Sequence, residues 1–202
     1  MTTGNRRFSV FLVPAADDYR WAEGVIREFA ARYGTPAFEP HVTVYGGPFA
    51  VKTELGPLRR VLAEVVPAMA PVTLRVAGLG VTEEYFLSLF VSFGEEPSLR
   101  RLHEAVKQAV ASDSGYELVP HLSLLYADIP LEVKEMAART VLLDRGEMRF
   151  DGVKIVAPDP VTGWSDTMRW QTLLRFIPGN ESPSYLAAAA PWGLPNWGRS
   201  SG

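Results

Sequence analysis

The sequence predicts an α+β fold with two pseudo-duplicated lobes, each built from an antiparallel β-sheet and helices. The first observation is the order of the elements, which is strand, helix, strand, helix, two strands, helix, strand, helix, two strands. The second is that each half places a histidine-bearing strand before a helix and a pair of strands. The third is that 47% of the 202 residues are hydrophobic, which suffices for one domain or two small interlocked lobes.

The first half of the chain is predicted to contain two strands, each followed by a helix. Periodicity places the strands at residues 8–13 and 38–45 and the helices at about 19–33 and 52–69. Asp17 and Asp18 are expected to cap the first helix, and Gly34 is expected to end it. Pro14 ends the first strand, and the run 46–48 (Gly-Gly-Pro) ends the second.

The second half repeats this plan with a hairpin in front. The predicted elements are strands 71–81 and 85–93, helix 95–112, strand 118–126, helix 130–143, and strands 148–156 and 168–177. Residues 157–166 are predicted to form a long loop. Residues 179–202, rich in Gly, Pro, Ser and Ala, are expected to be a disordered tail behind a domain of residues 1–178.

Two short segments repeat the pattern proline, histidine, apolar residue, hydroxyl residue, apolar residue. They are Pro40-His41-Val42-Thr43-Val44 and Pro120-His121-Leu122-Ser123-Leu124. Because side chains alternate between the two faces of a strand, each histidine shares a polar face with its hydroxyl residue, and the apolar pair points into a core. A single His-x-Thr is weak evidence, but the repetition, which uses two of the three histidines, makes these strands a candidate site.

The paired residues fit acid–base chemistry on a phosphate ester. A histidine with an ordinary pKa near ~6.5 can be neutral while its neighbour is protonated, so one ring can take a proton and the other can give one. The hydroxyls of Thr43 and Ser123 can donate to phosphate oxygens. The sequence offers no convincing metal-ligand set around His41 and His121, so no metal and no other cofactor is expected.

The amino-acid composition limits the classes of molecule that the protein is expected to bind. The formal charge of −3, from 20 basic and 23 acidic residues, gives no reason to expect long nucleic acid or an anionic membrane as a partner. The chain has no cysteine, which excludes a disulfide framework and a thiolate nucleophile. No apolar run approaches a membrane span and no signal-peptide pattern follows the N-terminus. We therefore expect a cytoplasmic monomer that acts on a small phosphorylated molecule.

Three other residues are weighed as secondary candidates. His103 lies among charged residues and is interpreted as part of a solvated helix face. Tyr45 shares its strand face with His41 and Thr43, so it either lines the cleft or packs in the core. Trp164, in the long loop, is interpreted as a loop anchor rather than a stacking platform for a base. No arginine is assigned to the phosphate.

The paired His-x-Thr/Ser strands resemble those of the two-histidine (2H) phosphoesterase superfamily. Segments 40–46 and 120–128, and the closing segment 170–176, look most like the cyclic nucleotide phosphodiesterases of plants and yeast, and the resemblance covers residues 6–178. It implies a bilobal α+β protein with a central cleft. It also implies hydrolysis of ADP-ribose 1″,2″-cyclic phosphate, a by-product of tRNA splicing, to ADP-ribose 1″-phosphate, and of nucleoside 2′,3′-cyclic phosphates to 2′-phosphates.

The resemblance also implies roles for five residues. They are His41 and His121 as the catalytic acid–base pair, Thr43 and Ser123 as phosphate-binding residues, and Tyr126 as a substrate contact. Strict alternation puts Tyr126 on the face opposite His121, so it reaches the cleft only if the strand ends or bulges near Leu125. Which histidine is the acid stays open, with a preference for His121 as base and His41 as acid.

Two other functions are kept as alternatives. One is an RNA 2′,3′-cyclic phosphodiesterase or 2′-5′ RNA ligase-like enzyme that acts on RNA ends. Such an enzyme would need a basic groove for the RNA strand, and the excess of acidic over basic residues does not indicate one. The other is a non-catalytic binder of a phosphate ligand, which would have no need for two proton-transfer groups.

Overall fold

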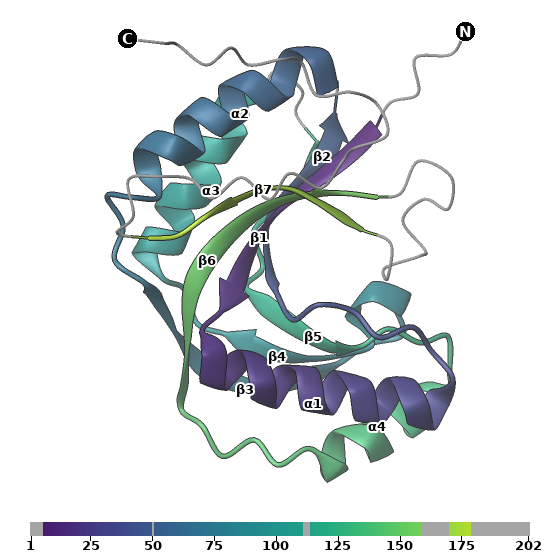
Figure 1. The fold of residues 1–202 in the computed structure, drawn as a ribbon. Coiled ribbons are helices and arrows are strands. Elements are labelled where there is room, and N and C mark those ends of the chain that lie inside the picture. Colours follow the sequence, from purple (N-terminus) through teal and green to yellow (C-terminus); the bar gives the residue numbers. More distant parts are fainter. Residues whose placement is uncertain (1–5, 50, 111–113, 159–169, 179–202) are drawn as a thin grey trace, which may run out of the picture.

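The computed structural model describes residues 6–49, 51–110, 114–158 and 170–178 (Figure 1). The strands are β1 (Arg6–Pro14), β2 (Val42–Phe49), β3 (Val72–Val81), β4 (Leu89–Phe93), β5 (His121–Leu125), β6 (Glu147–Ala157) and β7 (Gln171–Phe176). The helices are α1 (Ala16–Tyr33), α2 (Val51–Val65), α3 (Pro97–Ala109) and α4 (Leu131–Thr140), with a short 3₁₀ helix η1 (Tyr85–Leu87) before β4. The predicted tail from residue 179 and the loop that contains Trp164 lie outside the described residues.

The predicted α+β class with antiparallel strands is confirmed. The strands form one sheet in the order β1-β2-β5-β4-β3-β6-β7, and a further pairing of β1 with β6 closes it into a barrel-like ring. The two expected lobes therefore share a continuous sheet. In Figure 1, α2 and α3 lie on one side of it and α1 and α4 on the other, so the helices divide into two groups.

The topology supports the predicted pseudo-duplication but moves its boundary. The unit β1-α1-β2-α2-β3 corresponds to β4-α3-β5-α4-β6, because β1 pairs with β2 as β4 pairs with β5. Likewise β1 pairs with β6 as β4 pairs with β3. Each repeat thus begins one strand and one helix before its histidine strand, and the two histidine strands become neighbours at the centre of the arrangement.

The apolar residues of the two motifs enter the core as predicted. Val42, Val44, Leu122 and Leu124 are all fully buried. The helices cover them with apolar residues at helical spacing, which are Ala22, Ile26 and Phe29 on α1 and Leu99, Leu102 and Val106 on α3. Burial of these alternate strand residues forces the other set, which contains the histidines and hydroxyls, onto the opposite face.

The start of α1 differs from the prediction. The helix begins at Ala16, and Asp17 and Asp18 lie in its first turn instead of capping it. The Asp18 carboxylate is used elsewhere, because it accepts hydrogen bonds from Arg145 Nη1 at 2.7 Å and from the backbone N–H of Arg149 at 2.7 Å. Asp18 therefore ties α1 to β6, a long-range contact that local sequence cannot reveal.

Both histidine strands are shorter than predicted at their N-terminal ends. β2 starts at Val42 and β5 at His121, whereas starts at 38 and 118 were expected. The prolines Pro40 and Pro120 explain the difference, because proline has no backbone N–H to donate to a ladder. The predicted hairpin forms between β3 and β4, but residues 85–87 make the turn η1 and not the start of the second strand.

Within the part of the chain that the structure describes, no helix combines the length and the apolar character needed to cross a bilayer.

Candidate active site

The two histidine strands meet at a single residue pair. Val42 of β2 lies opposite Leu122 of β5 in an antiparallel ladder, and both side chains are fully buried. β5 continues on its other side against β4, where Ser123 faces Phe90 and His121 faces Ser92. The meeting of β2 and β5 is the contact that brings the two sequence motifs together.

The register around this pair places the four motif side chains on one face. Alternation on either side of this pair puts His41 and Thr43, next to Val42, on the same face as His121 and Ser123, next to Leu122. The two histidines are therefore diagonal neighbours across the strands. Their proximity has an electrostatic consequence, because a positive charge on His121 lowers the pKa of His41.

Both imidazoles are held by the same local hydrogen bond. His41 Nδ1 donates to the backbone carbonyl of Glu39 at 2.6 Å, and His121 Nδ1 donates to that of Val119 at 2.7 Å. A carbonyl can only accept, so Nδ1 carries the proton in each ring and Nε2 is the atom available for proton transfer. The extended backbone around the preceding proline brings this carbonyl to the ring in both motifs.

His41 occupies an apolar aromatic site. Its side chain is buried, and its ring stacks on Phe11 with centroids 3.7 Å apart and planes 18° apart. The ring of Trp170 lies 6.0 Å away. Burial lowers the pKa of His41 to about 4, with a smaller lowering from the charges of His121 and Lys154, while the hydrogen bond to the backbone opposes the shift. His41 is therefore neutral near pH 7.

His121 lies in a less enclosed position. Burial lowers its pKa, and its hydrogen bond to Val119 works in the opposite direction. Its ring contacts the Phe90 ring edge-on, with centroids 5.6 Å apart. Phe90 in turn lies over Gly80, and a Cβ atom added at position 80 would be 2.3 Å from Cζ of Phe90. Gly80 thus leaves the space that the Phe90 ring needs beside His121.

The two hydroxyl residues differ in their surroundings. Thr43 is half-buried on the face that carries the histidines. Ser123 is buried, and its hydroxyl donates to the backbone carbonyl of Phe86 at 3.2 Å. To donate to a phosphate oxygen, Ser123 would have to release the Phe86 carbonyl.

Tyr126 follows directly after the end of β5. The strand stops at Leu125, which removes the constraint of alternation. The Tyr126 ring is buried and stacks on Phe38, with centroids 3.8 Å apart, and burial raises the pKa of its hydroxyl. Tyr126 thus packs against an aromatic ring in this structure, and its role as a substrate contact stays a prediction.

The sequence left open whether Tyr45 lines the cleft or packs in the core, and the structure shows that it packs in the core. It is buried against the rings of Phe8 and Tyr116, each with a centroid distance of 5.9 Å. The register between β1 and β2 shifts here, because the consecutive β1 residues Val10 and Phe11 face Tyr45 and Thr43 and leave Val44 as an extra residue in β2. Parity with the motif residues was therefore a poor guide to its position.

The prediction that His103 lies on a solvated face is wrong. His103 is buried, and its Nδ1 donates to the carbonyl of Val44 at 2.8 Å. Its position next to Leu102 and four residues after Leu99 belongs to the apolar stripe of α3, and this spacing was the signal that the flanking charges obscured. His103 braces β2 from the side of α3.

Sequence reasoning also missed the cationic residues near the site. Lys154 on β6 is buried, forms an ion pair with Glu39, and lies opposite Phe11 on β1. Arg175 on β7 lies opposite Lys154 in the ladder. The sequence did contain a signal for these two cations, since Lys154 and Arg175 are charged residues inside otherwise apolar strand segments. The side chains of Arg6 and Arg7 lie outside the described part.

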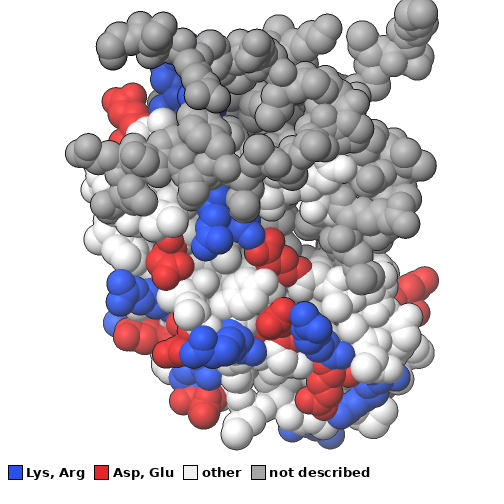
Figure 2. Space-filling view, in the orientation of Figure 1, with Lys and Arg blue, Asp and Glu red and all other residues white. Residues whose placement is uncertain are grey.

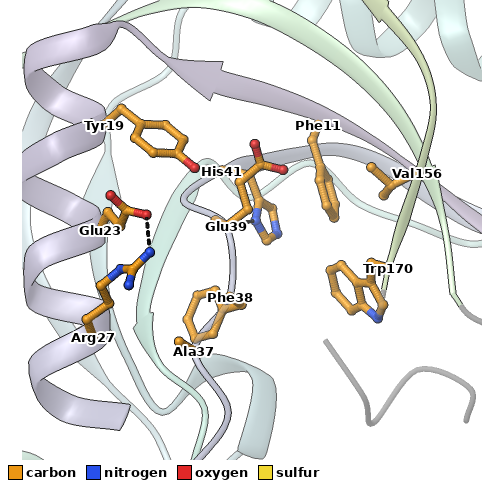
Figure 3. A pocket seen from close by; sticks show the side chains of 10 residues that line it. All are labelled: Phe11, Tyr19, Glu23, Arg27, Ala37, Phe38, Glu39, His41, Val156 and Trp170. Atoms are coloured by element: carbon orange, nitrogen blue, oxygen red, sulfur yellow. Dashed lines mark hydrogen bonds and ion pairs between the residues drawn. The ribbon is translucent and has the colours of Figure 1, made fainter. Parts of the chain in front are cut away.

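A pocket of about 400 Å³ opens beside His41 (Figure 3). Its lining residues come from α1, the segment before β2, β1, β6 and the residue before β7, and they are Tyr19, Glu23, Arg27, Ala37, Phe38, Glu39, His41, Phe11, Val156 and Trp170. Thr43, His121 and Ser123 do not line it, so of the four motif residues only His41 contacts this pocket. Within the described ranges, no cluster of three or more His, Asp or Glu residues that could hold a metal ion is present.

Comparisons with known proteins agree with this arrangement. The profile of the 2′-5′ RNA ligase superfamily matches residues 14–161. The crystal structure of E. coli LigT complexed with 3′-AMP shares 17% identity over 87% of this chain and 98% of that chain, with a TM-score of 0.57. The crystal structure of TT0787 of Thermus thermophilus shares 16% identity over 87% of this chain and 100% of that chain, with a TM-score of 0.59. A search of curated proteins found no match.

Proposed function

We propose the function of this chain from one premise, which is that it belongs to the 2′-5′ RNA ligase superfamily of 2H phosphoesterases. Within this superfamily we propose a metal-independent hydrolase that opens cyclic phosphodiesters. Its substrates would be ADP-ribose 1″,2″-cyclic phosphate and nucleoside 2′,3′-cyclic phosphates, and its products ADP-ribose 1″-phosphate and nucleoside 2′-phosphates. We propose in addition that its activity is like that of the cyclic nucleotide phosphodiesterases of plants and yeast.

The observation that carries the proposal is the pairing of Val42 with Leu122. It brings two imidazoles, each with Nδ1 bonded to a backbone carbonyl, and two hydroxyls to one face. General acid–base catalysis needs such a pair of groups, one to take a proton and one to give it.

The proposed mechanism assigns His41 as base and His121 as acid, the reverse of the preference from sequence. The low pKa of His41 keeps its Nε2 unprotonated, so it can take a proton from the attacking water. The oxygen of that water bonds to phosphorus as the P–O3′ bond breaks, and His121 Nε2 gives its proton to the leaving 3′ oxygen. A bound phosphate anion favours the protonated form of His121. The hydroxyl of Thr43 donates to a non-bridging oxygen.

The charge distribution supports a small substrate. On the face drawn in Figure 2, acidic and basic side chains are interspersed over the described part, and no continuous basic surface runs across it. A long RNA strand would favour such a surface. The structures of E. coli LigT include complexes with phosphate and 3′-AMP, which are ligands of the size we propose here. We further propose that the protein works as a monomer, without a membrane or cofactor.

The test is hydrolysis of ADP-ribose 1″,2″-cyclic phosphate and of the four nucleoside 2′,3′-cyclic phosphates in EDTA, with phosphorus NMR of the products. Turnover to 1″- or 2′-phosphates is expected. Replacing His41 or His121 by Ala should lower kcat by about 10²–10⁴-fold. Full activity of His41→Ala would refute the mechanism. Activity only on RNA with a cyclic end would point to the RNA enzyme, and binding without turnover to the non-catalytic alternative.

A further inference from the structure

The pocket beside His41 has one aromatic side and one polar side (Figure 3). The aromatic side consists of Phe11, Phe38 and Trp170, and the rings of Phe11 and Trp170 lie 5.5 Å apart. At about 400 Å³, the pocket falls within the ~300–1,000 Å³ range of small-molecule sites. A flat, apolar-faced group attached to the phosphate held between the histidines would find stacking surfaces here.

The polar side carries two carboxylates and a phenol. Glu23 and Tyr19 project from α1, and Glu39 comes from the segment before β2. Arg27 Nη2 donates to Oε1 of Glu23 at 2.9 Å, and Lys154 pairs with Oε1 of Glu39. Each carboxylate is therefore held in place through one oxygen. Within the described part of the chain, these bonds leave Oε2 of both groups as hydrogen-bond acceptors.

Tyr19 lies in the field of both carboxylates. Burial raises the pKa of its hydroxyl, and the charges of Glu39 and Glu23 raise it further. The hydroxyl therefore stays protonated and is a donor as well as an acceptor. Figure 3 shows it directed toward the interior of the pocket, on the side of His41 and Glu39.

Inside the pocket, this set of groups favours a neutral ring over an anion. Arg27, the cation among the described lining residues, is already paired with Glu23. An additional anion would meet two carboxylates at close range, which is unfavourable in a partly buried site. A neutral ring with N–H donors along one edge would meet acceptors instead.

We propose that this pocket binds the base of a nucleoside cyclic phosphate and selects a base with adjacent N–H donors, guanine foremost, through the carboxylate of Glu23. The inference rests on the proposed function and adds the substrate preference of the same site. Guanine presents a ring N–H next to an exocyclic amino group, and a carboxylate accepts both at once. Glu39 forms the second acceptor, but its backbone carbonyl also holds His41, so Glu23 is the residue to test.

The sharpest comparison uses guanosine and inosine 2′,3′-cyclic phosphates, which differ by the exocyclic amino group alone. The wild-type protein should prefer guanosine in kcat/KM by about tenfold, the value of one hydrogen bond to a charged acceptor. Glu23→Gln replaces half of the acceptor by a donor and should bring this ratio close to one, mainly through a higher KM for guanosine.

Glu28→Gln is the matched control. Glu28 lies on the same helix and pairs with Arg32 four residues on, as Glu23 pairs with Arg27, but it is exposed and does not line the pocket. This variant should keep the wild-type ratio. A wild-type protein that does not distinguish the two substrates, or a Glu23→Gln variant that keeps the preference, overturns the inference while the proposed hydrolase stands.

Calorimetry separates failure of the inference from failure of the proposed function. Guanosine 2′-phosphate and inosine 2′-phosphate are titrated into wild-type protein and both variants. Tighter binding of the guanosine ligand, lost in Glu23→Gln and kept in Glu28→Gln, supports the base pocket even if no cyclic phosphate is hydrolysed. Equal binding of the two ligands to the wild-type protein refutes it, whatever the activity.

Discussion

The burial of His41 should make the stability of the protein depend on pH in a predictable way. The pKa of His41 is about 4 in the folded protein, while an exposed histidine in the unfolded chain has a pKa near ~6.5. Between these values the unfolded chain binds more protons than the folded one, so stability falls as the pH is lowered. The loss begins below about pH 6.5 and levels off near pH 4, where the folded protein also takes up the proton.

The expected magnitude follows from the two pKa values. Lowering the pH from 7 to 5 should reduce the free energy of unfolding by about 2 kcal/mol through His41 alone. For a chain of this size, that corresponds to a fall in Tm of about 4–8 °C. His121 adds a loss of the same sign, because its pKa is also lowered.

The assay is urea unfolding at pH 7, 6 and 5 for the wild-type protein and His41→Asn. The Asn side chain can still donate to the Glu39 carbonyl but does not titrate, so the variant should lose about 2 kcal/mol less than the wild type over this range. Equal losses in both proteins would refute the reasoning. An NMR titration of the wild-type ring checks the premise directly, since a His41 resonance that titrates above pH 6 contradicts it even if the variant does not fold.

Two further predictions concern groups that support the site. Tyr116→Phe removes the hydrogen bond from the phenol to the Thr43 carbonyl, which measures 2.9 Å, and should lower the free energy of unfolding by about 1 kcal/mol and reduce kcat; an unchanged urea midpoint would contradict this. Gly80→Ala forces the Phe90 ring to move and should cost about 1–3 kcal/mol with a fall in turnover. Gly94→Ala, where a Cβ meets nothing within 4 Å, should stay within about 0.5 kcal/mol of wild type, and equal effects of the two glycine substitutions would argue against the steric explanation.

The sequence was most informative where local periodicity decides the structure. The burial of Val42 and Leu122 and the strand–helix order followed from alternation and helical spacing, which are properties of short segments. His103 was misjudged because its charged neighbours outweighed its place in the apolar stripe of α3. The extent of the domain and the nature of the tail stay predictions, because the structure does not describe residues beyond 178.

The electrostatics of the site could not be predicted because they depend on pairs far apart in the chain. Lys154 forms an ion pair with Glu39, which lies 115 positions earlier in the chain, and no local pattern around either residue predicts this pair. The low pKa of His41 likewise arises from burial under Phe11, which lies on another strand. Sequence could therefore name the histidines but not their protonation, and the preference for His41 as acid followed from a pattern that carries no information about burial.

The ladder between the two histidine strands consists of a single residue pair. Here the pairing with β5 involves Val42 alone on β2, and side chains take the next two carbonyls of this strand, Tyr116 bonding Thr43 and His103 bonding Val44. These bonds hold β2 in position without the full β5 ladder. The position of the first histidine strand therefore depends on side-chain bonds from α3 and from Tyr116 as well as on its pairing with β5.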